Sequence, residues 1–480
     1  MNRVSTPQTR CRAGVARCDI TPPVGIYHRM WGAALHDRAT GVHRPLTATA
    51  LWLEPRATGA AHIVVAIDQC ILDAADIALI RSEVERTTGV SAADVHVCLS
   101  HTHGSGLMSR QRSDLPGGES IGPYLDDVAA KVSRLASEAR AQASPATIVY
   151  GVGRCALAAH RDFFDCENDR TVCGFNPEGL ADDTAIVGRI AAEDGQPIAT
   201  LVNYACHPTT LAWQNTLISP DWVGAMRETV ERAAGGICLF LQGASGDLGP
   251  REGFVGDVEV ADRNGRQLAY AVLAALESLP PPGTEYLYTG PVVSGAVIGT
   301  WSHRPLERSA LDANAVWRWM SLVVDLPYRN DLPTLAETTR DRERWLHEEE
   351  EARRNDDAPR VRDCRARVEQ MTRQIARLSA LAPGRAFPLA VPLGCLGGAV
   401  WVFVPGELYQ VFQTTLRARF APRPVVVATL AGGWQPGYIP PADAFGRGIY
   451  QEVIAATAPG SLEALIESVA NAAQSLIAEA

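Results

Sequence analysis

Polar side chains that can perform hydrolytic chemistry follow directly after several short apolar segments of the chain. These side chains are His101 and His103 after residues 94–100, His207 after 198–205, and Glu407 after 399–404. Imidazole and carboxylate groups are common zinc ligands, and a site with three of them keeps a position open for water. Bound zinc lowers the pKa of that water to about 7 and provides hydroxide at neutral pH. These residue types predict a hydrolytic metal centre, and a structural, hydrogen-bonded role for each histidine is the alternative.

The apolar segments themselves predict the elements that position these side chains. Each segment is short, rich in Val, Ile, Leu and aromatic residues, and bounded by Gly or Pro, which is typical of a buried strand. We expect strands at 62–68, 94–100, 198–205, 236–242, 399–404 and 424–430. Ligand crevices of open α/β sheets lie beyond the carboxyl ends of strands, so the polar side chains are expected to converge there. In an extended chain, His101 and His103 would present both imidazoles on one face, about 7 Å apart at Cα.

Helical patterns alternate with these strands. We expect helices at about 73–88, at 120–143, directly after Asp221, and from Glu407 onward. A further β-rich segment, 286–301, suggests that the sheet continues past the first half of the chain. The alternation predicts an α/β fold with mixed β-sheets flanked by helices.

Residues 335–382 differ in composition from the rest of the chain. Opposite charges are dense, apolar residues are sparse and recur at helical spacing, and Pro359 interrupts the pattern. This predicts two solvated helices that form an antiparallel hairpin, inserted into a single domain spanning residues 1–480. A lid or an oligomer contact is the functional interpretation of the insertion, and a solvated surface element is the alternative.

The composition excludes several classes of protein. Acidic residues outnumber basic ones by 54 to 44, which argues against binding to nucleic acid. Lys131 is the only lysine and lies on the solvated side of the helical pattern at 120–143. Schiff-base, pyridoxal-phosphate and P-loop chemistries need a lysine in the site and are therefore excluded. No run of about 18 apolar residues occurs, so we expect no membrane span.

The cysteines indicate a reducing, cytoplasmic setting. There are 11 of them, without CxxC spacing, and several lie inside apolar strand-like segments where a free thiol acts as a small hydrophobe. The first residues contain arginines but no apolar core of a secretory signal, which favours the same location.

Six motifs together resemble the neutral/alkaline, non-lysosomal ceramidases, which are zinc-dependent amidases that cleave N-acyl sphingosines. The motifs are AGVARCDITPPVG (13–25), LSHTHGSG (99–106), NYACHPTTL (203–211), LQGASGDLGP (241–250), VPGE (404–407) and GYIPPADAFGRGIYQE (437–452). They occur in the order found in that family and cover the catalytic domain almost completely. The resemblance implies the ceramidase catalytic-domain fold, with the charged hairpin as an insertion.

The resemblance also assigns roles to individual residues. It implies zinc ligands at His101, His207, Glu407 and Tyr438. His103 would lie beside the metal, where it handles protons or binds the oxyanion, and a structural role in the loop is the alternative. Tyr450 matches a second tyrosine near the metal that can donate to the oxyanion, with a buried helix-end aromatic as the alternative. Arg161 falls near a family arginine in a poorly matched segment, and a surface position is equally compatible.

Two departures from the family bear on mechanism and location. Gly249 stands where the ceramidases have a serine discussed as a nucleophile, and Ser245 lies outside any GxSxG turn. Direct attack by zinc-activated water is therefore the simpler expectation. The sequence also shows no C-terminal immunoglobulin-like domain, which favours a cytoplasmic relative with a changed substrate.

Three aspartates at strand ends or loop starts are candidates to orient the zinc-ligating histidines. Asp68, Asp221 and Asp247 each occupy such a position. For Asp221, which precedes a helical pattern, capping of the helix is the favoured interpretation.

The prediction is a zinc amidohydrolase that cleaves a C–N amide bond of a small or medium-sized molecule by zinc-activated water. A ceramidase-type lipid amidase or esterase on the same site is the first alternative, and a non-catalytic binding protein is the second. The expected partner is a small-molecule amide, without nucleic acid or integral membrane association, and a homo-oligomer is compatible with the charged hairpin. Arginines in the pocket loops, expected at 109–120, 161–179, 212–219 and 301–330, could bind a carboxylate and would then favour an acidic amide over a ceramide.

Overall fold

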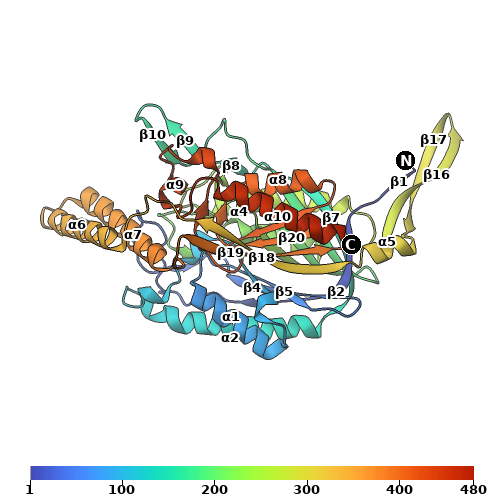
Figure 1. Ribbon diagram of the computed structural model, residues 1–480, viewed down its shortest axis with the longest axis horizontal. Helices are drawn as coiled ribbons and strands as arrows, with labels where there is room; N and C mark the ends of the chain where they lie inside the picture. Colours follow the sequence, from blue (N-terminus) through green and yellow to red (C-terminus); the bar gives the residue numbers. More distant parts are fainter. Residues whose placement is uncertain (1, 480) are drawn as a thin grey trace.

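A mixed sheet of eight strands forms the centre of the computed structural model, which describes residues 2–479 (Figure 1). In spatial order the strands are β14 (Ile237–Gln242), β12 (Pro197–Tyr204), β11 (Thr184–Ala192), β7 (Ser144–Arg154), β2 (Gln8–Asp19), β4 (Thr47–Pro55), β5 (His62–Ile67) and β6 (Val95–Leu99). The pairs β12–β14 and β5–β6 are parallel and the other pairs are antiparallel. The sheet curls so that its two edge strands, β6 and β14, approach each other. This curl brings the chain after β6 close to the chain after β12.

A second sheet packs against one face of the first. Its strands, in spatial order, are β18 (Trp317–Pro327), β19 (Ala386–Leu396), β20 (Ala399–Val404) and β22 (Val425–Thr429). The side chains between the two sheets form one buried cluster, which includes Leu51, Leu201, Trp401 and Phe403. Because β20 and β22 run parallel and β22 contacts both β6 and β14, the carboxyl ends of strands from both sheets meet.

Helices cover the two outer faces, so the molecule has four layers (Figure 1). The free face of the large sheet packs against α1 (Ala74–Thr88), α2 (Ile121–Ala141), α3 (Trp222–Ala234) and α4 (Val258–Glu277). The free face of the small sheet packs against α8 (Val411–Phe420) and α10 (Ser461–Ala478). The α/β fold class with mixed sheets and flanking helices is therefore confirmed.

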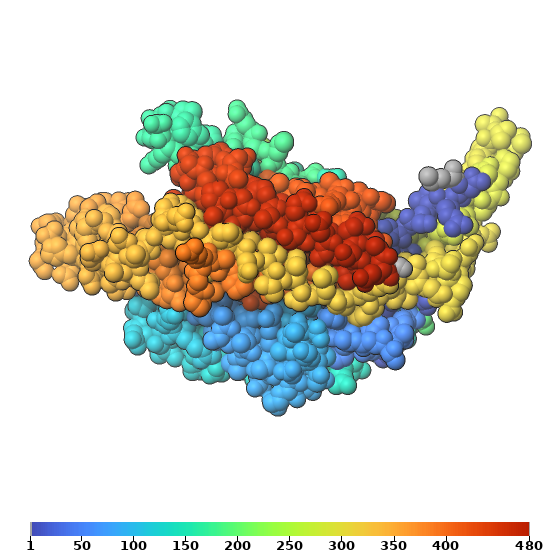
Figure 2. Space-filling model, viewed as in Figure 1, coloured from blue at the N-terminus to red at the C-terminus, as the bar shows by residue number. Residues whose placement is uncertain are grey.

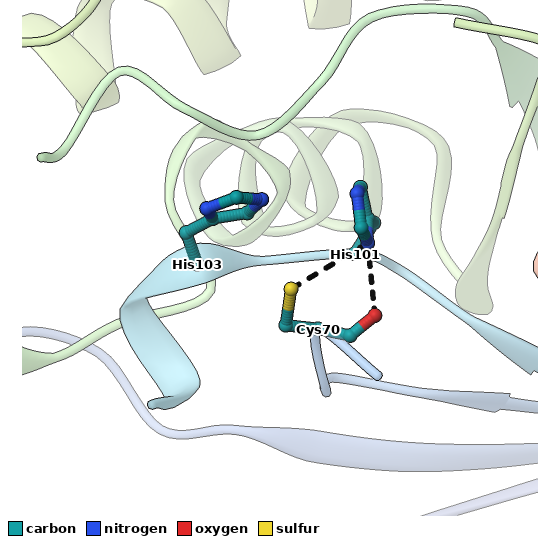
Figure 3. Close-up of side chains that lie close together, drawn as sticks. All are labelled: Cys70, His101 and His103. Atoms are coloured by element: carbon teal, nitrogen blue, oxygen red, sulfur yellow. Dashed lines mark hydrogen bonds between the residues drawn. The ribbon is translucent and has the colours of Figure 1, made fainter. Parts of the chain in front are cut away.

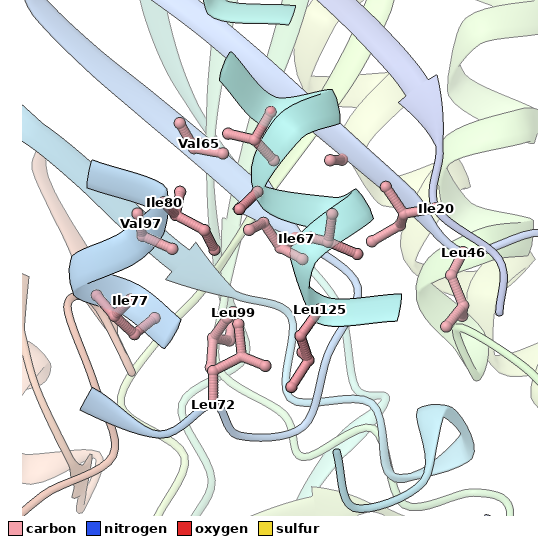
Figure 4. Packing of buried hydrophobic residues seen from close by; sticks show 14 of the residues in the cluster. Ile20, Leu46, Val65, Ile67, Leu72, Ile77, Ile80, Val97, Leu99 and Leu125 are labelled. Atoms are coloured by element: carbon pink, nitrogen blue, oxygen red, sulfur yellow. The ribbon is translucent and has the colours of Figure 1, made fainter. Parts of the chain in front are cut away.

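Burial on both faces explains why the strands read as continuous apolar segments. In β4, Ala50 and Trp52 face the helices while Leu51 and Leu53 face the second sheet. Successive side chains of a strand point to opposite faces, so a strand between two covered faces needs apolar residues at every position. Figure 4 shows the helix side of this packing, where Ile77 and Leu125 from the helices meet Ile67 and Leu99 from the sheet.

Two expected elements differ from the structure. Residues 286–301 do not extend the large sheet, because β16 (Thr284–Ser294) and β17 (Ala296–Pro305) form a projecting hairpin that pairs only with β1 (Arg3–Val4) among residues 2–479. The helix expected from Glu407 begins at Val411, because Glu407 belongs to a two-residue strand, β21 (Glu407–Leu408). That strand pairs in parallel with β23 (Tyr438–Ile439).

The charged segment forms α6 (Leu335–Arg354) and α7 (Ala358–Ser379), which pack against each other. The side chain of Thr334 and that of Glu337 cap the first helix reciprocally, and Pro359 lies in the first turn of the second. Figure 2 shows the pair projecting from one end of the molecule and the β16–β17 hairpin projecting from the other. The C-terminal half of α7 is not solvated, however, because Glu369, Gln374 and Arg377 are buried.

Shorter elements complete the described chain. They are β3 (Gly41–Val42), η1 (Ala92–Asp94), η2 (His103–Ser105), η3 (Arg110–Arg112), η4 (Gly118–Ser120), β8 (Ala158–His160), β9 (Asp162–Asp165), β10 (Arg170–Cys173), β13 (Leu217–Ile218), β15 (Leu248–Pro250), α5 (Arg308–Ala313), η5 (Ala442–Ala444) and α9 (Tyr450–Ile454). Over residues 2–479, none of the helices combines the length and apolarity that crossing a bilayer requires. That the chain is a single domain stays a prediction.

Candidate metal centre and active site

His101 lies two residues beyond the end of β6 in an unusual backbone conformation. Its φ of 65° lies in the left-handed region that non-glycine residues seldom adopt, and its N–H donates to the carbonyl of Gln69 at 2.9 Å. On the side chain, Nδ1 lies 2.9 Å from the carbonyl oxygen of Cys70, and the Cys70 sulfur is 3.6 Å away (Figure 3). A carbonyl only accepts, so the proton is on Nδ1 and the lone pair of Nε2 is available to a ligand.

His207 is held in the same way, three residues after β12. Its Nδ1 lies 2.6 Å from the carbonyl oxygen of Ser245 and 3.0 Å from that of Leu248. Burial, reinforced by the cationic Arg161, lowers the pKa of His207 to about 3. The imidazole is therefore neutral at pH 7, with its proton on Nδ1 and a free lone pair on Nε2.

Glu407 comes from the second sheet and faces both imidazoles. Its Oε2 lies 3.2 Å from Nε2 of His101 and 2.9 Å from Nε2 of His207. Its Oε1 accepts a hydrogen bond from the indole of Trp434 at 2.6 Å. Burial alone would raise the pKa of Glu407, but the two histidines that face its carboxylate, His101 foremost, hold that pKa well below its ordinary value.

These three side chains fit a zinc ion. The two Nε2 atoms and the Glu407 oxygen all lie within 4.8 Å of one another, and all three side chains are buried. Two imidazoles and one carboxylate are a donor set that zinc uses when one position stays open. Carbonyl groups fix each imidazole from behind, which is the usual support for a metal-ligating histidine. The identity of the metal stays a prediction, as do the three residues as its ligands.

A second group of metal-ligating side chains shares one member with the first. The ligating atoms of Cys70, His101 and His103 also lie within 4.8 Å of one another (Figure 3). Of the two ring nitrogens of His101, Nδ1 is already paired with the Cys70 carbonyl, and Nε2 faces Glu407. The orientation of His101 therefore favours the group that contains His207 and Glu407.

Tyr438 and Arg161 lie on the His207 side of this cluster. The Tyr438 hydroxyl is 3.3 Å from Nε2 of His207, and parallel pairing of β21 with β23 sets Tyr438 opposite Glu407. The Arg161 guanidinium donates to the Tyr438 hydroxyl at 2.9 Å and to the Gly246 carbonyl at 2.6 Å. Burial raises the pKa of Tyr438 well above its ordinary value even though Arg161 opposes the shift, so the phenol is protonated. Arg161 is 3% exposed, which places it in the buried site rather than at the surface.

His103 lies beside the cluster with both ring nitrogens buried and without a hydrogen-bond partner among the described residues. Its ring centroid is 5.1 Å from that of His101 and 4.9 Å from Trp31, which is in turn edge-on to Trp213 and Phe254. Burial lowers the pKa of His103 well below its ordinary value, so the ring is neutral. A buried pair of unsatisfied nitrogens points to a water molecule or a ligand as the missing partner. The expected extended His-x-His geometry is wrong, because His101 is left-handed and His103 starts a 3-10 turn.

Tyr450 stands at the rim, at the first residue of α9. Its ring centroid is 5.9 Å from that of Tyr438, and the residue is 49% exposed. The structure therefore brings His101, His103, Arg161, His207, Glu407, Tyr438 and Tyr450 into one site, although the role of each stays a prediction.

The aspartates have other partners. Asp68 accepts both hydrogen bonds of the Arg227 fork at 2.9 and 2.6 Å, and Asp247 accepts from Gln410 at 2.8 and 2.7 Å. Asp221 caps α3 at the Trp222 N–H. The idea that Asp68 or Asp247 orients a zinc-ligating histidine is therefore wrong, because backbone carbonyls do this instead.

Ser245 and Gly249 are the two positions that bear on a serine mechanism. Ser245 is buried, and its hydroxyl lies 3.2 Å from Nδ1 of His207, behind the ring rather than on the cluster side. At Gly249, an added Cβ would meet no atom closer than 3.8 Å, and the Arg161 side chain would be at 4.0 Å. The chain therefore has room for a larger side chain beside Arg161 at position 249.

Several contacts of the site were not identified from the sequence. Trp434 lies in the segment 431–438 after β22, and only its place at a strand end could have indicated it. The carbonyls of Cys70, Ser245 and Leu248 carry no signal in the sequence at all, since every residue has one.

Comparisons with known proteins find similarity in structure only. No protein-family model and no curated protein matches the sequence. The crystal structure of a neutral ceramidase from Pseudomonas aeruginosa superposes with a TM-score of 0.67 at 16% identity, covering 99% of this chain and 75% of that one. A ceramidase complexed with C2 gives a TM-score of 0.64 at 15% identity, covering 98% of this chain and 76% of that one. The resemblance expected from six short motifs is confirmed at the level of the fold: over nearly its whole length, this chain has the fold of the neutral ceramidases.

Proposed function

We propose that the protein is a zinc-dependent amide hydrolase whose ion is held by His101, His207 and Glu407. The observation that carries the proposal is the convergence of two Nε2 atoms and one carboxylate oxygen within 4.8 Å, at the carboxyl ends of strands from both sheets. Zinc bound there would polarise the amide carbonyl and lower the pKa of water. The names of the fold neighbours support an amide bond as the target.

The surrounding residues divide the remaining work. His103 is neutral and unpartnered, so one ring nitrogen can take the proton of the attacking water and deliver it to the leaving nitrogen. Tyr450 at the rim donates its phenolic hydrogen to the developing oxyanion. Arg161 holds the hydroxyl of Tyr438 toward His207, where Tyr438 would be an additional, weaker ligand of a bound zinc ion.

The test combines metal analysis with a substrate panel. Purified protein is expected to contain about one zinc per chain and to hydrolyse members of a panel of N-acyl amino acids, cyclic amides, short peptides and ceramide. His207→Ala is expected to lose both zinc and hydrolysis, while His347→Ala, an exposed residue of α6, keeps both. Full hydrolysis by metal-free His207→Ala would contradict the proposal. Ceramide is in the panel because it is the substrate class that the fold neighbours suggest, and exclusive cleavage of it would favour a lipid amidase.

We also propose a cytoplasmic location and a small-molecule substrate. All 11 cysteines are free, and eight of them are buried, which suits a reducing compartment. Recovery of a tagged protein from the soluble cytoplasmic fraction is the expected result, and recovery from a secreted or membrane fraction would contradict it.

A further inference from the structure

The C-terminal half of α7, which packs against the body of the protein, carries three charged residues beside the site: Glu369, Arg373 and Arg377. The first two form an ion pair with each other. Glu369 accepts from Arg112 at 2.7 Å and from Arg373 at 2.6 Å. Arg373 also donates to the carbonyl of Met30, next to Trp31, whose ring lies against His103. These contacts fix the inner turns of α7 to the body of the protein beside the active site.

The third residue, Arg377, has no counter-charge. It is 9% exposed, its Nε is buried without a hydrogen-bond partner, and the one side-chain hydrogen bond that it donates among residues 2–479 goes to Gln374, one turn earlier on its own helix. No carboxylate in the described part of the chain forms an ion pair with it, whereas Arg373 has Glu369. A buried guanidinium without an anion is costly, so the site is incomplete without a negatively charged partner.

A single side chain, that of Trp434, lies between Arg377 and the proposed zinc ligand Glu407. Its guanidinium carbon is 6.0 Å from the centre of the Trp434 ring, and Trp434 donates to Oε1 of Glu407. Glu407 cannot serve as the missing partner, since one of its oxygens accepts from Trp434 and the other faces the two imidazoles. Arg161 on the other side is already committed to Tyr438 and Gly246.

We propose that Arg377 binds a carboxylate of the substrate, so that the enzyme acts on amides that carry a free carboxylate, with N-acyl amino acids as the class. The inference rests on the proposed amide hydrolysis and names its substrate. A guanidinium group can donate two parallel hydrogen bonds to the two oxygens of a carboxylate. A neutral lipid amide has no carboxylate to accept them. This arginine comes from the inserted helical pair, and not from the pocket loops in which the sequence predicts a carboxylate-binding arginine.

The kinetic test compares two substrates that differ only in the carboxylate. N-acetyl-L-phenylalanine carries it and N-acetylphenethylamine lacks it, and release of acetate is measured for both. The zinc-loaded enzyme is expected to show at least a tenfold higher kcat/KM for the carboxylate substrate. Arg377→Gln should lose about tenfold to a hundredfold of kcat/KM for that substrate and leave the neutral one unchanged. Arg377→Lys, which keeps the charge but not the fork, should fall between the two.

A matched control and a binding measurement complete the design. Arg367→Gln on the same helix, whose guanidinium lies over Trp345 away from the site, should behave as wild type. Calorimetric titration with the amine products, L-phenylalanine and phenethylamine, should show a preference for phenylalanine that Arg377→Gln abolishes, in protein whose thermal midpoint matches wild type.

The outcomes separate the two proposals. Equal kcat/KM for both substrates, or an unchanged preference in Arg377→Gln, would overturn the carboxylate site and leave amide hydrolysis standing. Arg377-dependent binding of phenylalanine without cleavage of any amide would overturn the proposed hydrolysis and support the carboxylate site.

Discussion

The indole nitrogen of Trp434 donates a hydrogen bond to Oε1 of Glu407 at 2.6 Å, while Oε2 of the same carboxylate faces His101 and His207. The indole therefore fixes which oxygen faces the imidazoles. A carboxylate freed from this contact can rotate and lose its alignment with the two Nε2 atoms.

Trp434→Phe removes the donor and keeps an aromatic ring. We expect zinc affinity to fall about tenfold to a hundredfold, the usual effect of losing a group that orients a metal ligand. Competition with a chromophoric chelator measures the affinity. Trp345→Phe, in the projecting helical pair, is the control, and equal zinc affinity of the two variants would show that the indole does not position Glu407.

Arg161→Lys keeps a positive charge but cannot contact both the Tyr438 hydroxyl and the Gly246 carbonyl. We expect kcat/KM to fall about tenfold to a hundredfold, since a hydrogen bond to a charged group contributes roughly 1.5–3 kcal/mol. The zinc content should stay near one per chain. Arg154→Lys, an exposed residue paired with Asp183, should leave kcat/KM unchanged. An active Arg161→Lys enzyme would contradict a positioning role for Arg161.

Glu369 links the stability of the protein to pH. Burial alone would raise its pKa, but Arg373 and Arg112 lower it to about 2, from an ordinary value of 4.5. Because the folded-state pKa is depressed, the stabilisation is complete above pH about 4.5 and is lost as the pH falls toward 2. The shift corresponds to roughly 3 kcal/mol.

Urea unfolding of wild type and Glu369→Gln as a function of pH measures this contribution. At pH 7 the variant should be about 3 kcal/mol less stable, since it leaves the buried guanidinium of Arg112 and the half-buried one of Arg373 without a carboxylate. The difference should shrink below pH 4. The exposed Glu350→Gln should change stability by less than about 1 kcal/mol, and a pH-independent difference for Glu369→Gln would contradict the linkage.

Asn203 joins the two sheets. Its amide nitrogen donates to the carbonyls of Leu241 at 3.0 Å and Val427 at 2.7 Å, and its oxygen accepts from the Val427 N–H at 3.1 Å. Asn203→Leu would leave these buried groups unpaired and should cost about 3 kcal/mol or more of unfolding free energy. Asn471→Ala on the exposed face of α10 is the control. A thermal midpoint of Asn203→Leu equal to wild type would show that the amide does not couple the sheets.

The sequence was informative wherever burial is uniform. Segments such as 236–242 and 399–404 lie between two covered faces, and their unbroken apolar composition predicted strands to within one residue. The same reasoning placed His101, His207 and Glu407 at strand ends, where parallel pairing brings them together.

The remaining features depend on tertiary contacts that leave no local pattern. The sequence periodicity predicts a helix that begins at Glu407. In the structure, pairing with Tyr438, 31 residues later, places Glu407 in a strand instead. His101 has a positive φ in a turn where its N–H donates to the carbonyl of Gln69, a contact distant in sequence. Arg377 lies in a segment that reads as solvated throughout, and only the docking of its helix end buries it.

The order of the cluster along the chain has a consequence for biosynthesis. His101 and His207 emerge from the ribosome early, but Glu407 is 200 residues further on than His207 and belongs to the second sheet. A nascent chain that stops before β20 has both imidazoles and no carboxylate to face them. The proposed centre can therefore form only after synthesis has passed Glu407, so a shorter nascent chain is expected to lack the proposed activity.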